Sequence, residues 1–236
     1  MFENNSATLN GKHTYYDYGL YVTNTNPVAP PTPKTQYIQI PGKNGDLDLT
    51  EALTGYTLYN NRTITLKLGG KKNPELWPTF RRVFMNEIHG KIVKVIFDDE
   101  KEYYYIGRAK VNADLNQQHT IASFTVTINA EPFKYSITST TEPWIWDCFS
   151  FIDGVIQEYA DLQVDGTLNY TVVGSEMPVI PEFIVTGNLS VVYEGVSYDL
   201  TPGVNKIYDI VFLDREYDLT FTGTGTVSIS YRRGRL

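Results

Sequence analysis

The sequence predicts a mainly β protein of two domains. The first is a β-sandwich or barrel-like domain with one α-helix, and the second is a jelly-roll type β-sandwich. Short apolar stretches separated by turn residues run along most of the 236 residues, a pattern typical of such folds. The chain also holds 18 tyrosines, which suit strands because the pleated surface accepts aromatic side chains.

The distribution of charge indicates where one domain ends and the next begins. Residues 1–138 hold 15 Lys and Arg against 13 Asp and Glu, and residues 139–236 hold 5 against 14. The two parts therefore differ in net charge, +2 against −9, as expected for modules with different neighbours. We expect domains at 1–138 and 139–236, with a hinge at Glu131, Pro132 and Phe133, and a short linker over residues 138–141.

In the first domain, residues 19–22 form a short apolar strand, and residues 63–68 alternate as a half-buried strand does. Residues 35–40 predict a further strand in which Tyr37 is out of phase with Ile38 and Ile40. Three more strands are expected over residues 92–97, 103–110 and 121–130. The acidic turn at residues 98–101 is interpreted as a hairpin tip, because the spacing and central glycine of a calcium loop are absent.

One helix is expected between the glycine pair 69–70 and Gly90. Its apolar stripe comprises Leu76, Phe80, Val83, Phe84 and Ile88. Proline is tolerated only in the first turn of a helix, so Pro78 places the start at about Trp77. Gly90 is positioned as the C-terminal cap.

The stretch from residue 27 to residue 45, on both sides of the strand expected at 35–40, is rich in proline and glycine. Prolines remove backbone donors and favour an extended path, and glycines allow tight turns. Two interpretations stay open: a stiff surface loop, or an arm that reaches a neighbouring subunit. The candidate arm residues are Pro27, Pro30, Pro31, Pro33, Pro41, Gly42 and Gly45.

The second domain is punctuated by turns at residues 153–154, 165–166, 186–188, 194–195, 202–203 and 222–223. Between these turns we expect strands at residues 170–173, 183–185, 189–193, 207–212, 217–221 and 226–231. Short strands with this spacing predict a β-sandwich.

The sequence predicts no catalytic residue, no cofactor site and no metal site, so the chain is not expected to be an enzyme. His13, His89 and His119 lie in unrelated segments, which leaves no histidine pair for a metal and no catalytic triad. Asp46 and Asp48 are interpreted as solvated surface groups. Cys148 stands alone and is interpreted as a packed small side chain.

Residues 1–6 contain neither a basic region nor an apolar region, so no secretory signal is expected. No apolar run approaches the ~20 residues that span a bilayer. We therefore expect synthesis in a bacterial cytoplasm and no membrane partner.

Several segments together resemble the distal tail proteins of long-tailed phages that infect Gram-positive bacteria. They are GLYVTNTNP from Gly19, IPGKNGDLDLTEALTG from Ile40, FTVTINAEPFKY from Phe124 and GTGTVSISYRRGRL from Gly223. The segment WDCFSFIDGVIQEYADLQVDG from Trp146 is similar to the stretch after the hinge in some members of that family.

This resemblance implies a structural virion protein of the tail tip or baseplate. The N-terminal domain would close into a hexameric ring, and the C-terminal domain would be a galectin-like sandwich on the outside. The implied partners are other copies of the chain, the major tail tube protein and the tail-associated lysin or hub protein, with receptor-binding or tape-measure proteins as further candidates. DNA would pass through the lumen without specific binding.

An alternative is a lectin-like module that binds carbohydrate on the host cell wall. A galectin site needs a tryptophan that stacks on sugar beside a cluster of His, Arg and Asn. All three histidines lie in the first domain, and Trp144 and Trp146 lie at the start of the second. We therefore interpret the second domain as a docking platform.

Overall fold

The computed structural model describes residues 6–112, 116–143 and 157–236. These residues form two compact units, each of which is described by itself. Unit 1 comprises Met1–Glu100 and Tyr104–Pro132, and unit 2 comprises Lys101–Tyr103 and Phe133–Leu236. The expected boundary at 138/139 stays a prediction. The expected turn at residues 153–154, together with Trp144, Trp146 and Cys148, lies outside the described residues.

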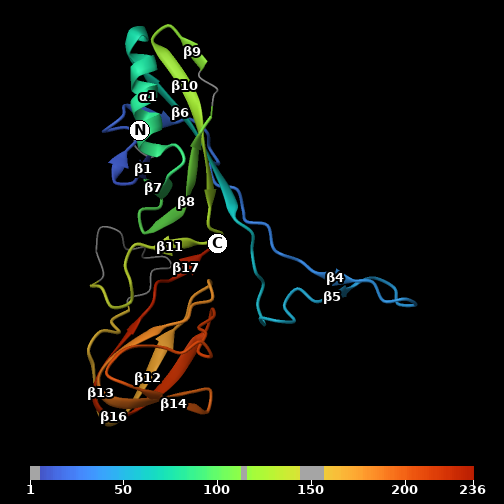
Figure 1. Ribbon diagram of the computed structural model, residues 1–236, viewed down its shortest axis with the longest axis vertical. Coiled ribbons are helices and arrows are strands. Elements are labelled where there is room, and N and C mark those ends of the chain that lie inside the picture. The colour runs from blue at the N-terminus through green and yellow to red at the C-terminus, as the bar shows by residue number, and fades with distance from the viewer. Residues whose placement is uncertain (1–5, 113–115, 144–156) are drawn as a thin grey trace. The chain divides into compact units, whose positions relative to one another are not determined.

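Unit 1 is built on a curled antiparallel sheet with the strand order β2-β1-β7-β8-β10-β6-β3 (Figure 1). Its strands are β1 (Ala7–Leu9), β2 (Lys12–His13), β3 (Leu20–Val22), β6 (Arg62–Lys71), β7 (Ile92–Phe97), β8 (Tyr103–Val111), β9 (Asn116–Gln118) and β10 (Ile121–Ala130). Strand β9 pairs with the start of β10. The predicted strands 92–97 and 121–130 are confirmed, and those at 19–22, 63–68 and 103–110 differ from β3, β6 and β8 only at their ends.

Helix α1 (Trp77–Ile88) follows a 3-10 turn, η1 (Pro74–Leu76), and covers one face of this sheet (Figure 1). The predicted start at Trp77 is confirmed, and Gly90 after the helix has a φ of +76°. Phe84 packs against Phe124 of β10 with ring centroids 5.3 Å apart.

The predicted stripe of α1 is wrong at two positions. Leu76 is 54% exposed and Val83 is 48% exposed. Because Leu76 belongs to the 3-10 turn, the helical phase begins one residue later, at Trp77. The buried stripe is therefore Trp77, Phe84 and Ile88, with Phe80 partly buried against the same core.

Every second residue along β6, β8 and β10 is buried beneath α1. Ile64, Leu66 and Leu68 of β6 supply one row of the core, and each lies opposite an inward-facing residue of β10. This period of two fixes which side chains of the sheet point away from the helix.

Unit 2 contains a second antiparallel sheet with the order β12-β16-β13-β14, in which β15 also pairs with β13 (Figure 1). The strands are β12 (Leu162–Val173), β13 (Glu182–Tyr193), β14 (Val196–Leu200), β15 (Gly203–Lys206) and β16 (Glu216–Ser230). The short β11 (Lys134–Ser136) pairs with β17 (Gly234–Arg235). The predicted turn at 194–195 lies between β13 and β14, as expected, whereas the one at 202–203 overlaps the start of β15 at Gly203.

Three other predicted turns lie inside long strands, which corrects the expected strand boundaries. Residues 165–166 lie within β12, residues 186–188 within β13 and residues 222–223 within β16. The segments predicted as strands on either side are halves of one strand. Phe183 and Val185 before the glycine of β13, and Leu189 and Val191 after it, all belong to a single core.

The predicted strand 207–212 is also wrong. Only Phe212 pairs there, through an isolated bridge to Val179. Ile210 and Phe212 are both buried in the core of unit 2. Their apolar character therefore serves packing rather than a strand ladder.

Taken together, the described residues confirm a mainly β chain that holds one α-helix. None of its helices is both long enough and apolar enough to cross a bilayer in the part of the chain described.

Candidate assembly surfaces

The proline-rich segment begins as an extra edge beside β6. Thr65 donates its backbone N–H to the Pro27 carbonyl at 2.7 Å, and Ala29 donates to the Thr63 carbonyl at 3.0 Å. A bridge also joins Val28 to Ile64. Pro27 is thus fixed to the sheet, whereas the residues after Ala29 leave it.

Residues 29–61 form an extended double segment, which we call the arm (Figure 1). Lys34 donates its N–H to the Leu58 carbonyl at 2.7 Å, and Asn60 donates to the Thr32 carbonyl at 2.8 Å. Pro33 is bridged to Tyr59. Proline has no backbone N–H to donate. The prolines of the outgoing half nevertheless cost little stability, because other residues supply the hydrogen bonds between the two halves. Pro33 is therefore paired with the returning half, and Pro30 and Pro31 lie between the bridges at Val28 and Pro33.

At the far end of the arm, β4 (Tyr37–Ile38) pairs with β5 (Leu47–Asp48) as a short hairpin. The predicted strand 35–40 is thus only two residues long, and both residues are exposed. Pro41, Gly42 and Gly45 lie in the connection between the two strands. Gly42 has a φ of +83° and Gly45 of +74°, a conformation that glycine adopts without steric cost.

No residue of the arm is buried, although several are large and apolar. Leu53 is 97% exposed, and Ile38, Ile40 and Leu58 are each at least 40% exposed. Burying a leucine or isoleucine side chain completely is worth about 1.5–3 kcal/mol. The arm therefore gains little from hydrophobic burial in the isolated chain and has much to gain from a partner.

A shallow hollow of about 560 Å³ lies along the arm. It is lined by Pro33, Thr35, Asp48, Thr50, Glu51, Ala52 and Thr57. Thr57 donates to Glu51 at 2.6 Å, and hydrogen bonds from Thr50 lower the pKa of the Asp48 carboxyl. Both acidic groups are thus tied to threonines of the arm.

The expected hinge coincides with the junction between the two compact units. Glu131 still donates its N–H to the Ile106 carbonyl at 2.9 Å within unit 1. Unit 1 ends at Pro132, and unit 2 resumes at Phe133. A hinge motion at these three residues stays a prediction.

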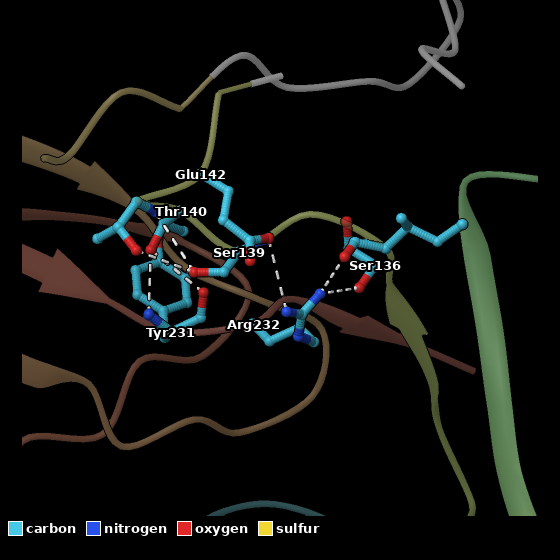
Figure 2. A network of polar contacts seen from close by, with 8 residues as sticks. Ser136, Ser139, Thr140, Glu142, Tyr231 and Arg232 are labelled. Carbon is cyan, nitrogen blue, oxygen red and sulfur yellow. Dashed lines mark hydrogen bonds and ion pairs between the residues drawn. The ribbon is translucent and has the colours of Figure 1, made fainter. Parts of the chain in front are cut away.

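The expected linker at 138–141 is instead a fixed part of unit 2 (Figure 2). Thr140 is 3% exposed. Its hydroxyl donates to the Ile229 carbonyl at 2.7 Å and accepts the Tyr231 N–H at 3.0 Å. The Arg232 guanidinium donates to the Ser136 carbonyl at 2.7 Å and lies 3.6 Å from the Glu142 carboxylate. The residues after the hinge are therefore clamped to the C-terminal segment.

The described residues contain no group of three or more His, Cys, Asp and Glu side chains that could hold a metal ion. His13 contacts the Asp98 carboxylate at 2.9 Å, and His89 accepts the Val111 N–H. Both histidines thus stabilise local structure. Asp46 and Asp48 lie on the arm and are exposed.

The apolar exposure of the arm was not predicted from the sequence. The sequence signal for this exposure was that apolar and polar residues do not alternate at Tyr37, Ile38 and Ile40. A strand with one buried face shows such alternation. Strand β4 has no buried face, so its pattern has no period.

The described residues thus form a curled antiparallel sheet with one helix on one face, followed by a unit with a second antiparallel sheet. The sequence resembles the phage distal tail proteins, and the fold can be compared with theirs. The structure matches the crystal structure of SPP1 Dit, described as a paradigm of the hub adsorption apparatus in phages that infect Gram-positive bacteria. The TM-score is 0.54 at 12% identity, and the match covers 98% of this chain and 99% of that chain. The predicted resemblance is therefore confirmed as a likeness of fold.

No protein-family model matches this sequence, and no curated protein is significantly similar to it.

Proposed function

We propose that this chain is a structural, non-enzymatic component of a phage tail tip or baseplate, and that its N-terminal domain assembles into a hexameric ring. The observation that carries the proposal is the likeness of fold to SPP1 Dit over 98% of the chain. The arm supplies a physical reason for assembly, because its apolar side chains find no cover within one copy.

A closed ring needs two different complementary faces on each copy. We propose that the arm of one copy packs on the N-terminal domain of the next. At its tip, Tyr37 and Ile38 are already paired with Asp48 and Leu47 in the β4–β5 hairpin, so docking of the hairpin would cost little desolvation of that backbone. Leu53, Ile38 and Ile40 would supply the hydrophobic contact. The candidate residues Pro41, Gly42 and Gly45 would shape the tip.

The proposed partners derive from the same role. The ring would join the major tail tube protein to the tail-associated lysin or hub protein, and receptor-binding or tape-measure proteins are further candidates. The protein would reside in the virion at the tail tip and would need no cofactor. DNA would pass through the lumen of the ring.

The two domains would divide this work. Residues 1–138, with a net charge of +2, would carry self-assembly, and residues 139–236, with a net charge of −9, would lie outside the ring. An excess of one charge keeps identical surfaces apart. The acidic domain is therefore suited to face other baseplate proteins rather than copies of itself.

Carbohydrate binding by the C-terminal domain stays an alternative prediction. Trp144 and Trp146, the two tryptophans of residues 139–236, lie outside the described residues. Binding of the chain to a glycan array would favour the alternative, and its absence would favour a docking platform.

Electron microscopy of the purified chain tests the proposed function. We expect class averages of rings with sixfold symmetry. The variant Leu53→Asp should fold normally but yield fewer rings, because it places a charge where burial is proposed. If Leu53→Asp formed as many rings as the parent chain, the proposed role of the arm in assembly would be contradicted. Rings of another symmetry would contradict the proposed hexamer.

A further inference from the structure

Three tyrosines are exposed together at strand β3 and in the turn before it, at one edge of the unit 1 sheet. Tyr16 is 73% exposed, and Tyr15 and Tyr21 are 38% and 36% exposed. The ring centroids of Tyr16 and Tyr15 are 5.3 Å apart, and those of Tyr15 and Tyr21 are 4.6 Å apart. We call these three residues the tyrosine cluster. Because aromatic residues are enriched at the centre of protein interfaces, their exposure in one copy points to a partner.

The turn that carries Tyr15 and Tyr16 is fixed within the chain. The backbone N–H groups of both tyrosines donate to Nδ1 of His13 at 3.2 Å, and the Tyr16 ring packs on the His13 ring with centroids 4.5 Å apart. The Asp17 carboxylate accepts the His13 N–H at 2.6 Å. A surface that is ordered before binding loses little conformational entropy on docking. The tyrosine cluster is therefore a preformed surface.

A proline-rich segment of matching chemistry lies at the start of the arm. Residues 27–34 read PVAPPTPK, so prolines recur three residues apart. Bridges at Val28 and Pro33 pair both ends of the segment with the returning chain, which shows that the residues between them are extended. Pro30 and Pro33 are exposed. Extended proline segments dock on aromatic side chains and lose little entropy on binding, because proline restricts the backbone beforehand.

The prolines also determine how this segment can be recognised. One side of the segment is paired with the returning chain, and on the other side Pro30, Pro31 and Pro33 have no N–H to donate. Addition of a further strand is therefore unfavourable there. The proline carbonyls are acceptors, and the phenol hydroxyls of tyrosine are donors. Tyrosine side chains thus suit both the rings and the carbonyls of the segment.

Spacing and charge agree with this pairing. An extended proline segment advances about 3.1 Å per residue, so Pro30 and Pro33 lie roughly 9 Å apart, comparable with the two ring-to-ring steps of 5.3 and 4.6 Å. Lys34 ends the segment and forms no ion pair within the part of the chain that the structure describes. Asp17, next to Tyr16, is exposed. Opposite charges at the rim of an interface favour the correct partner.

The prolines cannot reach the tyrosine cluster of their own copy. Tyr21 lies opposite Gly69, near the end of β6. Pro33 lies opposite Tyr59, which precedes the start of β6, and the arm leads away from the sheet (Figure 1). Ten residues separate Tyr59 from Gly69, which is roughly 30 Å at about 3.3 Å per extended residue. A second copy must therefore supply the prolines.

We infer that the tyrosine cluster of one copy binds the proline-rich segment 27–34 of a second copy. The inference rests on the proposed function, in that copies of the chain associate, and it names the two surfaces that meet. Because each copy offers the cluster at one place and the segment at another, the contact is heterologous and can continue from copy to copy, as a ring requires.

A double-mutant cycle on self-association tests the inference. Tyr16→Ala and Pro30→Ala each remove one side of the contact, and sedimentation equilibrium of the full-length chain gives the dissociation constant. We expect each single variant to weaken association about tenfold, and the double variant to be no weaker than either alone, because one contact can be lost only once. Thermal unfolding of each variant verifies the fold.

The matched control is Tyr208→Ala in unit 2, since Tyr208 is also 73% exposed. It should leave association unchanged, alone and in combination with Pro30→Ala. Independent losses from Tyr16→Ala and Pro30→Ala, near a hundredfold together, would overturn the inference. Unchanged association in Tyr16→Ala, or an equal loss in Tyr208→Ala, would overturn it as well.

Photo-cross-linking identifies the neighbour directly. Benzoyl-phenylalanine replaces Tyr16 in the full-length chain, and isotope-labelled copies are mixed with unlabelled ones before illumination. We expect cross-links from position 16 to residues 27–34 of the other copy. A cross-link within one copy, or to another segment, would overturn the inference. Hexamers that give such a result contradict the inference alone, whereas a chain that never associates contradicts the proposed function as well.

Discussion

Gly187 of β13 and Gly225 of β16 lie directly opposite each other in the sheet of unit 2. A Cβ atom on Gly225 would lie 1.8 Å from the Thr186 carbonyl oxygen, and one on Gly187 would lie 2.4 Å from the Thr224 carbonyl oxygen. Both lie between the two apolar halves of their strands, and Gly187 itself is exposed. The two backbones approach so closely at this pair that only glycine fits. Strands β13 and β16 continue past the glycines instead of ending there.

Gly225→Ala should lower the free energy of unfolding of unit 2 by about 3 kcal/mol, because the methyl group collides with backbone that cannot move aside. The control is Gly166→Ala on β12, where nothing lies within 4 Å of the added Cβ but φ is +82°. That change should cost about 1 kcal/mol. Urea unfolding measures both. Equal costs would show that the close approach of the two strands does not matter.

Thr140→Val should destabilise the chain by about 1–3 kcal/mol. The substitution keeps the shape of the side chain but leaves the buried Tyr231 N–H without its acceptor. Thr171→Val is the control, because its hydroxyl donates to Asp218 at the exposed surface and its loss should cost less than about 0.5 kcal/mol. Chemical unfolding compares the two variants, and a neutral Thr140→Val would mean that the clamp shown in Figure 2 adds no stability.

Strands in which buried and exposed residues alternate could be predicted from the alternation of apolar and polar residues in the sequence. Strand β10 alternates along its whole length and was predicted with its correct ends, and Gly90 marked the end of α1. The glycines at 166, 187 and 223 were misread as turns. At 187 and 223 the reason is that a glycine in a turn and a glycine where two strands approach closely have the same sequence signal, and Gly166 lies opposite Gly223 in the same sheet. Only the pairing of Gly187 with Gly225, which are far apart in sequence, separates the two cases.

The position of the arm in the chain could be predicted from the sequence, but the pairing of its two halves could not. The prolines after Pro27 indicated an extended segment, and the structure places them in the arm. The pairing of Pro33 with Tyr59 and the exposure of Leu53 depend on the returning half of the arm, which no local pattern reveals. The clamp around Thr140 was mistaken for a linker because its residues are small and polar, whereas its partners lie at the other end of the chain.

Alkaline pH should destabilise the folded chain. Burial raises the pKa of Tyr105 and of Tyr193 to about 12 from the usual 10. Between pH 10 and 12 the unfolded chain has released these protons and the folded chain has not. Stability is therefore complete below pH 10 and falls as pH rises, by at most about 1.4 kcal/mol per pH unit for each tyrosine and by less where solvent screens the charge.

Tyr105→Phe tests this pH dependence. The variant should show a shallower loss of stability above pH 10 in thermal unfolding, because it has no phenol to ionise. Tyr208→Phe is the control, since Tyr208 is 73% exposed and should not change the slope. A Tyr105→Phe slope identical to that of the parent would exclude Tyr105 as a contributor.

Replacing residues 34–58 of the arm with a short glycine-serine turn should leave the fold intact. No residue of this stretch is buried, and the hydrogen bonds from Ala29 to Thr63 and from Thr65 to Pro27 are kept. We expect a change of less than about 1 kcal/mol in the free energy of unfolding. A large loss of stability in chemical unfolding would show that the arm supports its own domain instead of a neighbour.

The mass of the intact chain at micromolar concentration, measured by native mass spectrometry, tests the central claim most directly. We predict a dominant species with six times the 26.8 kDa mass of one chain, which shifts to the monomer when residues 34–58 are replaced. A parent chain that stays monomeric at every concentration, or an arm-replaced chain that still forms the hexamer, would contradict the account.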